Sequence, residues 1–244
     1  TYNYNDRKLV SVTEELNVPS RDLIRTSYYT YDSNGRVDTQ TYASGITVKN
    51  EYSSTGYLKA VYEGTSINSN KLLHRIDAIN AFGTDTTTFG NGMKTIMDYD
   101  LETGFVSSIE HRTPTGSAMN YQTYKWHSSG NMQERGYSRF SRSGNYYKET
   151  FTYDNHDRLY DAKSYLNGSY QRTLKTRYNN LGNITSKTST KTGDDDVTSY
   201  AYETQESGCS NQAGPHAVSR ATINGLLNRL CYDKNGYITR YSRS

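Results

Sequence analysis

A short motif that recurs along the chain constrains its fold more than any other feature. The motif is a tyrosine, then Asp or Asn, two or three variable residues, Gly, and a basic, amide or aromatic residue. It reads Tyr31-Asp32-Ser33-Asn34-Gly35-Arg36, Tyr178-Asn179-Asn180-Leu181-Gly182-Asn183 and Tyr232-Asp233-Lys234-Asn235-Gly236-Tyr237. Weaker copies are Tyr52-Ser53-Ser54-Thr55-Gly56-Tyr57, Tyr99-Asp100-Leu101-Glu102-Thr103-Gly104-Phe105, Trp126-His127-Ser128-Ser129-Gly130-Asn131 and Tyr153-Asp154-Asn155-His156-Asp157-Arg158. A repeated unit determines architecture before any single residue does.

The chemistry of the motif predicts a hairpin turn. An Asp at the first turn position accepts hydrogen bonds from backbone N–H groups two residues on, and Gly at the fourth position adopts φ > 0 without a Cβ clash. This combination is the type I turn with a Gly bulge found in longer hairpin loops. Asp157 replaces the Gly in one copy, and Asp tolerates the left-handed region, so we expect the same turn there.

Other Gly-containing segments predict turns of a second kind between the motif turns. They are Ala43-Ser44-Gly45, Gly90-Asn91-Gly92, Ser143-Gly144-Asn145, Asn167-Gly168 and Thr192-Gly193-Asp194. Short runs rich in Tyr, Thr, Val and Ile separate the turns, and such residues favour strands. The sequence therefore predicts an all-β, antiparallel meander of hairpins. Copies that start at 52 and 99, and at 178 and 232, lie 47 and 54 residues apart, so we expect a degenerate copy in each gap.

Composition limits how such a sheet can be stabilised. Only 33% of the residues are hydrophobic, and 25 of the 244 residues are tyrosines. Because a tyrosine buries its ring and keeps its hydroxyl hydrated, we expect a thin curved sheet with ladders of stacked tyrosines. Basic residues are dispersed and the net charge is only +3, so no nucleic-acid partner is predicted. No run of about 18 apolar residues is present, so we expect no membrane insertion.

The chain shows no pattern of catalytic or metal-ligating residues. Its five histidines, His74, His111, His127, His156 and His216, are far apart and lack ligand spacing, and no nucleophile, nucleotide or zinc-protease motif is found. We expect no enzyme activity, no cofactor and no metal. Two readings stay open for Cys209 and Cys231, a disulfide that staples the intervening loop or two free thiols.

The rhythm of the repeat divides the chain into three parts. Residues 1–202 are expected to form a repeat sheet, residues 203–229 an irregular loop or plug, and residues 230–244 the start of a further repeat. The first residue, Thr1, lies in a strand-like pattern without a leader, and the chain ends just after the turn at Asp233 to Gly236. We therefore expect a fragment of a larger array.

The motif at Tyr31 to Arg36 resembles the YD repeat, or Rhs repeat, of bacterial Rhs polymorphic toxins and of the B and C components of Tc toxin complexes. Teneurins of animals carry a more distant form. Gly214-Pro215-His216-Ala217-Val218, with Tyr232-Asp233 downstream, is similar to a segment near the end of bacterial Rhs arrays.

This resemblance implies a function as well as a fold. In the family, a spiralling β-sheet forms a hollow shell that encloses and protects a C-terminal toxin domain until delivery from a bacterial cell. The implied partners are the remainder of the shell, the enclosed toxin and a delivery or secretion component. The alternative is an extracellular adhesion or carbohydrate-binding module with a Tyr-rich β-surface, as the teneurin branch suggests. A closed propeller or barrel with a ligand pocket is a third hypothesis, disfavoured by the short and uneven repeat spacing.

Overall fold

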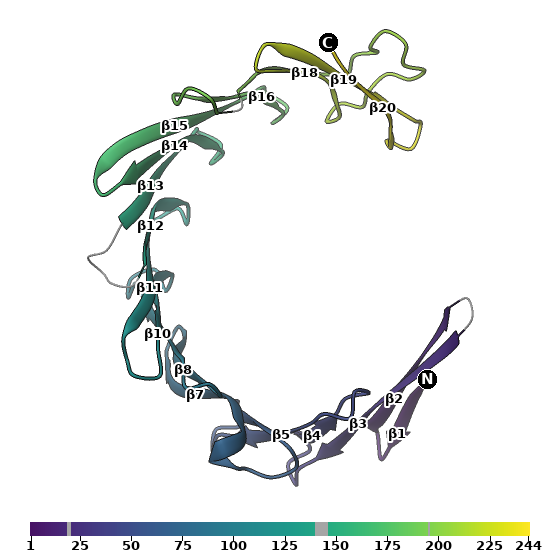
Figure 1. Ribbon diagram of the computed structural model, residues 1–244, viewed down its shortest axis with the longest axis vertical. Helices are drawn as coiled ribbons and strands as arrows, with labels where there is room; N and C mark the ends of the chain where they lie inside the picture. The colour runs from purple at the N-terminus through teal and green to yellow at the C-terminus, as the bar shows by residue number, and fades with distance from the viewer. Residues whose placement is uncertain (19–20, 140–145, 195) are drawn as a thin grey trace. The chain divides into compact units, whose positions relative to one another are not determined.

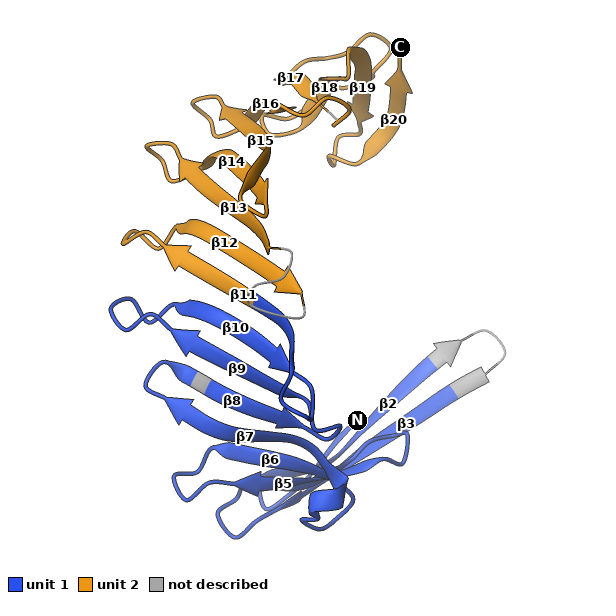
Figure 2. Cartoon of the chain, turned by 60° about the vertical axis from the view of Figure 1, so that its left-hand side comes forward, with its two compact units in different colours: residues 1–121 blue, residues 122–244 orange. Residues whose placement is uncertain are grey.

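The predicted all-β fold is confirmed. The computed structural model describes residues 1–18, 21–139, 146–194 and 196–244. Their regular structure is antiparallel strand, apart from one turn of 3-10 helix, η1 (Ser69–Lys71). No helix in these ranges has the length and apolar character needed to cross a membrane. The chain divides into two compact units, residues 1–121 and 122–244, so a unit boundary falls inside the predicted sheet of residues 1–202 (Figure 2).

In the first unit, each strand from β1 to β10 pairs antiparallel with the next (Figure 1). The strands are β1 (Tyr2–Asn5), β2 (Lys8–Val18), β3 (Arg21–Tyr31), β4 (Val37–Thr41), β5 (Thr47–Tyr52), β6 (Leu58–Glu63), β7 (Leu72–Asn80), β8 (Gly83–Phe89), β9 (Lys94–Tyr99) and β10 (Val106–Arg112). Strand β11 (Ala118–Trp126) contains the unit boundary.

In the second unit, the strands from β12 to β20 pair in the same consecutive order. They are β12 (Met132–Arg139), β13 (Tyr146–Tyr153), β14 (Leu159–Leu166), β15 (Ser169–Tyr178), β16 (Ile184–Ser189), β17 (Val197–Tyr202), β18 (Val218–Ile223), β19 (Leu226–Tyr232) and β20 (Ile238–Arg243). Because neighbours in sequence are neighbours in the sheet, each unit is a meander.

The degenerate copy predicted in the second gap is present, whereas the first gap holds a two-residue turn in which Asn80 pairs with Gly83. In the first gap, β7 turns into β8 at Asn80, whose Oδ1 accepts hydrogen bonds from the N–H groups of Phe82 and Gly83 at 2.8 and 3.1 Å. In the second gap, Tyr202 at the end of β17 pairs with Val218 at the start of β18, across a register shift. Complete copies have the same pairing, as between Tyr31 and Val37.

The irregular segment is shorter than the predicted 203–229. It ends at residue 217, because β18 and most of β19 lie within the predicted range. Ser219 and Ala221 are buried in β18. Asn224 and Gly225 form the tight turn to β19, both with positive φ (49° and 79°). The prediction missed this hairpin because the Gly and Pro residues at 208–215, together with Gly225, are typical of one irregular segment.

The second kind of turn was wrongly predicted at two positions. Tyr42 N–H donates to Ile46 O and Gly45 N–H donates to Tyr42 O, both at 2.8 Å, which is the pattern of the motif turn at Asp32. Phe89, Gly92 and Met93 repeat it. Asn167-Gly168 is a true two-residue turn, with φ of 51° and 80°, and Asp194 N–H closes a turn onto Lys191 O. The predicted turn at Ser143-Gly144-Asn145 lies outside the described residues.

The units have little apolar core. Each is a single layer of strands (Figure 2), and the side chains buried in the described ranges are small and more often polar than apolar. The apolar ones are Val48, Ala60, Tyr62, Ala162, Cys209, Ala213, Ala221 and Cys231. Cross-strand polar pairs supplement the backbone ladders: Thr30 and Thr39 hydroxyls lie 2.7 Å apart, and Lys59 Nζ lies 2.9 Å from Glu51 Oε1. Such pairs each contribute a few tenths to about 1 kcal/mol.

We predict that Gly90→Ala is destabilising by about 2 kcal/mol, because a side chain there would overpack against backbone that cannot yield. A Cβ on Gly90 would lie 2.0 Å from Leu72 O, and Gly90 N–H donates to Leu73 O at 2.9 Å. Urea denaturation measures the effect. Gly214→Ala is the matched control, since no atom lies within 4 Å of its added Cβ. Equal stability of the two variants would contradict this packing.

Candidate functional site

The motif turn is held by its acidic side chain. Asp32 Oδ1 accepts from the N–H groups of Asn34 and Arg36, each at 2.9 Å, and Asp32 Oδ2 accepts from Arg36 Nε at 2.8 Å. Asp154 repeats the arrangement with His156 N–H, Arg158 N–H and Arg158 Nε. The predicted role of this carboxylate is therefore confirmed, and it gains an arginine partner that the turn argument did not include.

Other copies keep the backbone bonds with different acceptors. Asp233 accepts from the N–H groups of Asn235 and Tyr237, and Asn179 does the same for Leu181 and Asn183. Asp100 accepts from Glu102 and Thr103 N–H. The residue at the Gly position of the motif has positive φ as predicted, including Asp157 at 57°. The glycines in this position are Gly35, Gly56, Gly104, Gly130, Gly182 and Gly236, with φ from 73° to 95°.

The motif tyrosines bond to backbone of the preceding strand, where we predicted stacked ladders. Tyr31 Oη donates to Leu9 O at 2.7 Å, Tyr153 Oη to Met132 O at 2.8 Å and Tyr178 Oη to Leu159 O at 3.0 Å. The same bond joins Tyr52 to Val37 O, Tyr202 to Ile184 O and Tyr232 to Val218 O, at 2.7, 2.7 and 2.8 Å. We call this bond the tyrosine lock. Where it forms, it joins a hairpin to the hairpin before it.

The lock takes a carbonyl at a position that the ladder with the following strand does not reach. Strands β14 and β15 are in register from Asp161 opposite Lys175, and Leu159 lies two residues beyond that last pair. Strands β18 and β19 end their ladder at Arg220, two residues from Val218. An unpaired carbonyl in a half-buried position is costly, so the tyrosine hydroxyl completes the pairing where the strands diverge towards their turns.

The basic residue of the motif connects two consecutive copies. The Arg36 guanidinium forms an ion pair with Asp32 at 2.7 Å and lies 4.2 Å from the ring centroid of Tyr52 in the next copy. Arg158 pairs with Asp154 at 2.6 Å and lies 4.6 Å from the Tyr178 ring. Lys8 stands over Tyr31 in the same way, at 5.3 Å. Each cation–π contact contributes about 0.5–1 kcal/mol at exposed sites.

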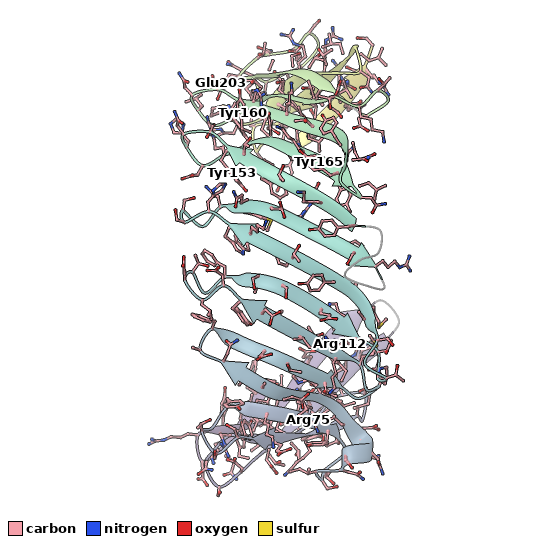
Figure 3. All side chains as sticks on the ribbon, turned by 90° about the vertical axis from the view of Figure 1, so that its left-hand side faces the viewer. Arg75, Arg112, Tyr153, Tyr160, Tyr165 and Glu203 are labelled. Carbon is pink, nitrogen blue, oxygen red and sulfur yellow. A yellow bond between two sulfur atoms is a disulfide. The ribbon has the colours of Figure 1, made fainter. Side chains whose placement is uncertain are left out.

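Two copies depart from this pattern. Trp126 has no hydroxyl, and its ring stacks on that of Tyr124 with centroids 6.3 Å apart. The Tyr99 ring packs against Phe82, with centroids 6.2 Å apart. Figure 3 shows how the side chains project from the strands, with Tyr153, Tyr160 and Tyr165 labelled.

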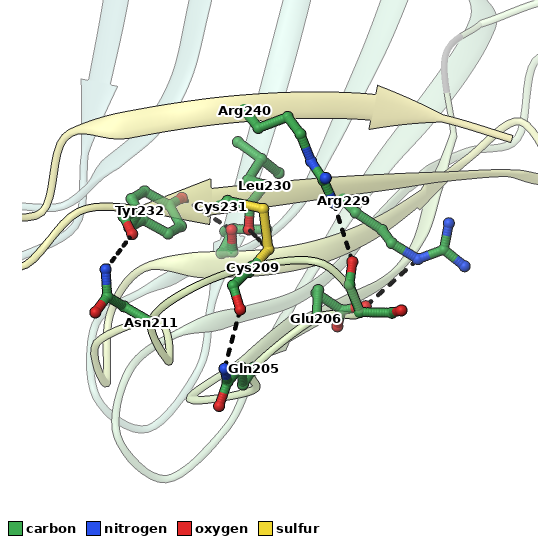
Figure 4. Close-up of a disulfide and its surroundings, with 11 residues drawn as sticks. Gln205, Glu206, Cys209, Asn211, Arg229, Leu230, Cys231, Tyr232 and Arg240 are labelled. Carbon is green, nitrogen blue, oxygen red and sulfur yellow. Dashed lines mark hydrogen bonds and ion pairs between the residues drawn. A yellow bond between two sulfur atoms is a disulfide. The ribbon is translucent and has the colours of Figure 1, made fainter.

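Residues 203–217 replace the five-residue turn of the motif with a long segment, which we call the strap. Cys209 in the strap forms a disulfide with Cys231 of β19 (Figure 4), which decides between the two readings left open by the sequence. Asn211 Nδ2 donates to Tyr232 O at 3.0 Å. At its far end, His216 Nδ1 lies 2.6 Å from Asn183 Oδ1, and Asn183 Nδ2 donates to Pro215 O at 2.7 Å. His216 therefore fixes the strap.

Charged and polar groups elsewhere in the described ranges make local contacts. Within the described ranges no three His, Cys, Asp or Glu side chains lie close enough to hold a metal ion. His111 Nδ1 lies 2.9 Å from Thr95 Oγ1, and His74 packs edge-on against Phe89. A shallow groove of about 590 Å³ runs beside the turns of the second unit. Its lining includes His127, Glu134, Phe151, Tyr153 and Asp154.

Comparison with known proteins gives structural likeness only. No family model and no curated protein matches the sequence. Among solved structures, the chain is similar to a TcdB2-TccC3-TEV crystal structure, with TM-score 0.46, 14% identity and coverage of 96% of this chain and 16% of that one. For a mutant Tc holotoxin pore of Photorhabdus luminescens, the TM-score is 0.42 and the identity 15%, with coverage of 96% of this chain and 16% of that one. For a porin-like protein from Bacteroides uniformis, the TM-score is 0.34 and the identity 12%, with coverage of 96% of this chain and 86% of that one. At these scores the likenesses assign neither family nor function.

Sequence reasoning found the turn residues but missed the tyrosine lock and the arginine contact between copies. A signal for the second was present. Arg36 and Arg158 each precede, by one copy, an aromatic residue at the end of an incoming strand. The lock also had a positional signal, because its acceptors Val37, Met132, Leu159 and Ile184 each directly follow a motif copy, but the bond uses their backbone and so leaves no mark on residue type.

We predict that Tyr178→Phe lowers the free energy of unfolding by about 1–2 kcal/mol, since it removes the donor to Leu159 O and leaves that carbonyl without its partner. The ring that faces Arg158 is retained. Urea denaturation of the two proteins gives the difference. Tyr28→Phe is the control, because Tyr28 is 56% exposed. If both variants lose the same stability, the hydroxyl bond is not what matters.

The Asp154 carboxyl should titrate unusually low. The Arg158 side chain donates hydrogen bonds to it and holds its pKa at about 2, below the ordinary 3.8. Its charged form therefore stabilises the fold fully above pH 3.8, and this contribution disappears as the pH falls to about 2. Carboxyl-carbon NMR titration should show the low pKa in the wild type and a value nearer the ordinary one in Arg158→Gln.

A matched variant isolates the charge. Asn179 shows that an amide serves the same turn, so Asp154→Asn keeps the backbone bonds. Its stability deficit should shrink as the pH is lowered through the range from 3.8 to about 2. A deficit independent of pH would rule out the ion pair as the cause.

Proposed function

We propose that the chain is a non-enzymatic segment of the wall of a toxin-encapsulating β-shell of the Rhs or Tc type. The shell encloses a C-terminal toxin domain and protects it until delivery from a bacterial cell. The observation that carries the proposal is the tyrosine lock. The same bond recurs from Tyr31 to Leu9 and from Tyr232 to Val218, so a sheet of any length can be extended without an apolar core beneath it.

The surface chemistry supports the same role. A container must exclude proteases, and a continuous polar sheet can do so. Ion pairs such as Lys49 with Asp38 and Arg135 with Glu149 lie across neighbouring strands. The wall isolates its cargo by enclosing it, without sequence-specific binding.

Limited proteolysis of the full-length gene product, with mass spectrometry of every fragment that stays bound, tests the proposal. We expect a protected C-terminal fragment to co-purify with a resistant shell that contains these residues. A product that retains no separate fragment and is cleaved as an exposed chain would overturn encapsulation. Binding to a glycan array in that case would instead support an adhesion module.

A variant pair sharpens the test. Tyr178→Phe together with Tyr232→Phe removes two locks from the second unit, so the enclosed fragment should become accessible at lower protease concentration. Tyr28→Phe, at an exposed position, should leave protection unchanged. Equal protection in both variants would mean that the locked sheet is not the barrier.

A further inference from the structure

The strap is an addition to a hairpin that does not need it. Tyr202 pairs with Val218 and Val197 pairs with Ile223, so β17 and β18 are joined along their whole length. Tyr202 Oη donates to Ile184 O at 2.7 Å, as in copies with a five-residue turn. The strands and the lock therefore do not depend on where residues 203–217 lie.

The strap lies against one face of the sheet, which the register identifies. Arg220 is opposite Arg229, and Cys231 is opposite Arg240. All four side chains project from the same face, and the strap contacts each of them. Arg240 Nη2 donates to Ser207 O at 3.0 Å, and Glu206 lies 3.8 Å from Arg220 Nε and 3.5 Å from Arg229 Nε. Figure 4 shows this arrangement around the disulfide.

The non-covalent contacts between the middle of the strap and the sheet are polar, and one buried oxygen among them lacks a hydrogen bond. Glu206 is only 7% exposed, yet its Oε1 accepts no hydrogen bond from the described residues. A buried carboxylate oxygen without a hydrogen bond opposes burial. The buried apolar side chains of the strap are Cys209 and Ala213, so hydrophobic burial adds little. The disulfide between Cys209 and Cys231 is the covalent contact of the strap with the sheet, beside the polar contacts of Glu206, Ser207 and Asn211.

We propose that the strap is a redox-released cover: reduction of the Cys209–Cys231 disulfide frees its middle from the sheet and uncovers the half-buried Arg229. The reductant is a thiol. Its thiolate attacks one sulfur and displaces the other as a thiolate. A second thiol resolves the mixed disulfide, which leaves two protein thiols and the oxidised reductant. Strands β17 to β19 stay paired throughout. The inference is independent of the proposed shell.

Hydrogen exchange with mass spectrometry on the whole chain, with and without dithiothreitol, tests the proposal. After reduction, amides of residues 204–213 should exchange at least tenfold faster, while those of β17, β18 and β19 change less than twofold. Modification of Arg229 by phenylglyoxal should rise in parallel. A thiol assay must confirm that both cysteines are free.

Three results would overturn the proposal. Unchanged exchange in residues 204–213 after full reduction means that non-covalent contacts hold the strap. Loss of protection in β17 to β19 together with the strap means that the disulfide supports the sheet. Faster exchange of residues 204–213 in the oxidised Glu206→Gln variant means that the ion pairs of Glu206 hold the strap on the sheet. The double variant Cys209→Ser, Cys231→Ser should exchange like reduced protein, and reduced wild type gives the same test if that variant does not fold.

Discussion

The bond from a tyrosine hydroxyl to the carbonyl of the preceding strand is the interaction on which the rest of the structure depends. A sheet with so few buried apolar side chains cannot rely on a packed core to keep its hairpins together. The ladder between consecutive hairpins also stops before the strand ends, as at Asp161 and Arg220. There the tyrosine hydroxyl donates to the strand-end carbonyl, as Tyr178 does to Leu159 O, and the arginine of the preceding turn, Arg158, lies over the tyrosine ring.

Because the lock lies at the ends of strands, the connection beyond it is free to vary. The turn after Tyr31 has five residues, whereas fifteen residues separate Tyr202 from Val218, and the paired ends are alike. The residues that pair the strands are therefore distinct from the residues of the connecting loop, so the loop can change in length without a change in the sheet.

The sequence was sufficient for the turns and the meander, because Asp, Asn and Gly act through local backbone geometry. Asp154 and Gly35 adopt their predicted roles for that reason. The sequence was insufficient where partners lie one strand away and use main-chain atoms, as with Leu159 O. It also misplaced the end of the irregular segment, because Gly225 belongs to a two-residue turn that looks continuous with the Gly and Pro residues before it. The disulfide could not be inferred, since spacing alone does not show that two cysteines face each other.

The lock has a direction. In every case the hydroxyl belongs to the later hairpin and the carbonyl to the earlier one, as from Tyr52 to Val37 and from Tyr178 to Leu159. The tyrosine of a hairpin therefore donates to a carbonyl of the hairpin that precedes it in the sequence. The same hairpin provides the carbonyl to which the tyrosine of the next hairpin donates. During synthesis from the N-terminus, each new hairpin can dock as soon as it forms, so the order of translation and the order of assembly coincide.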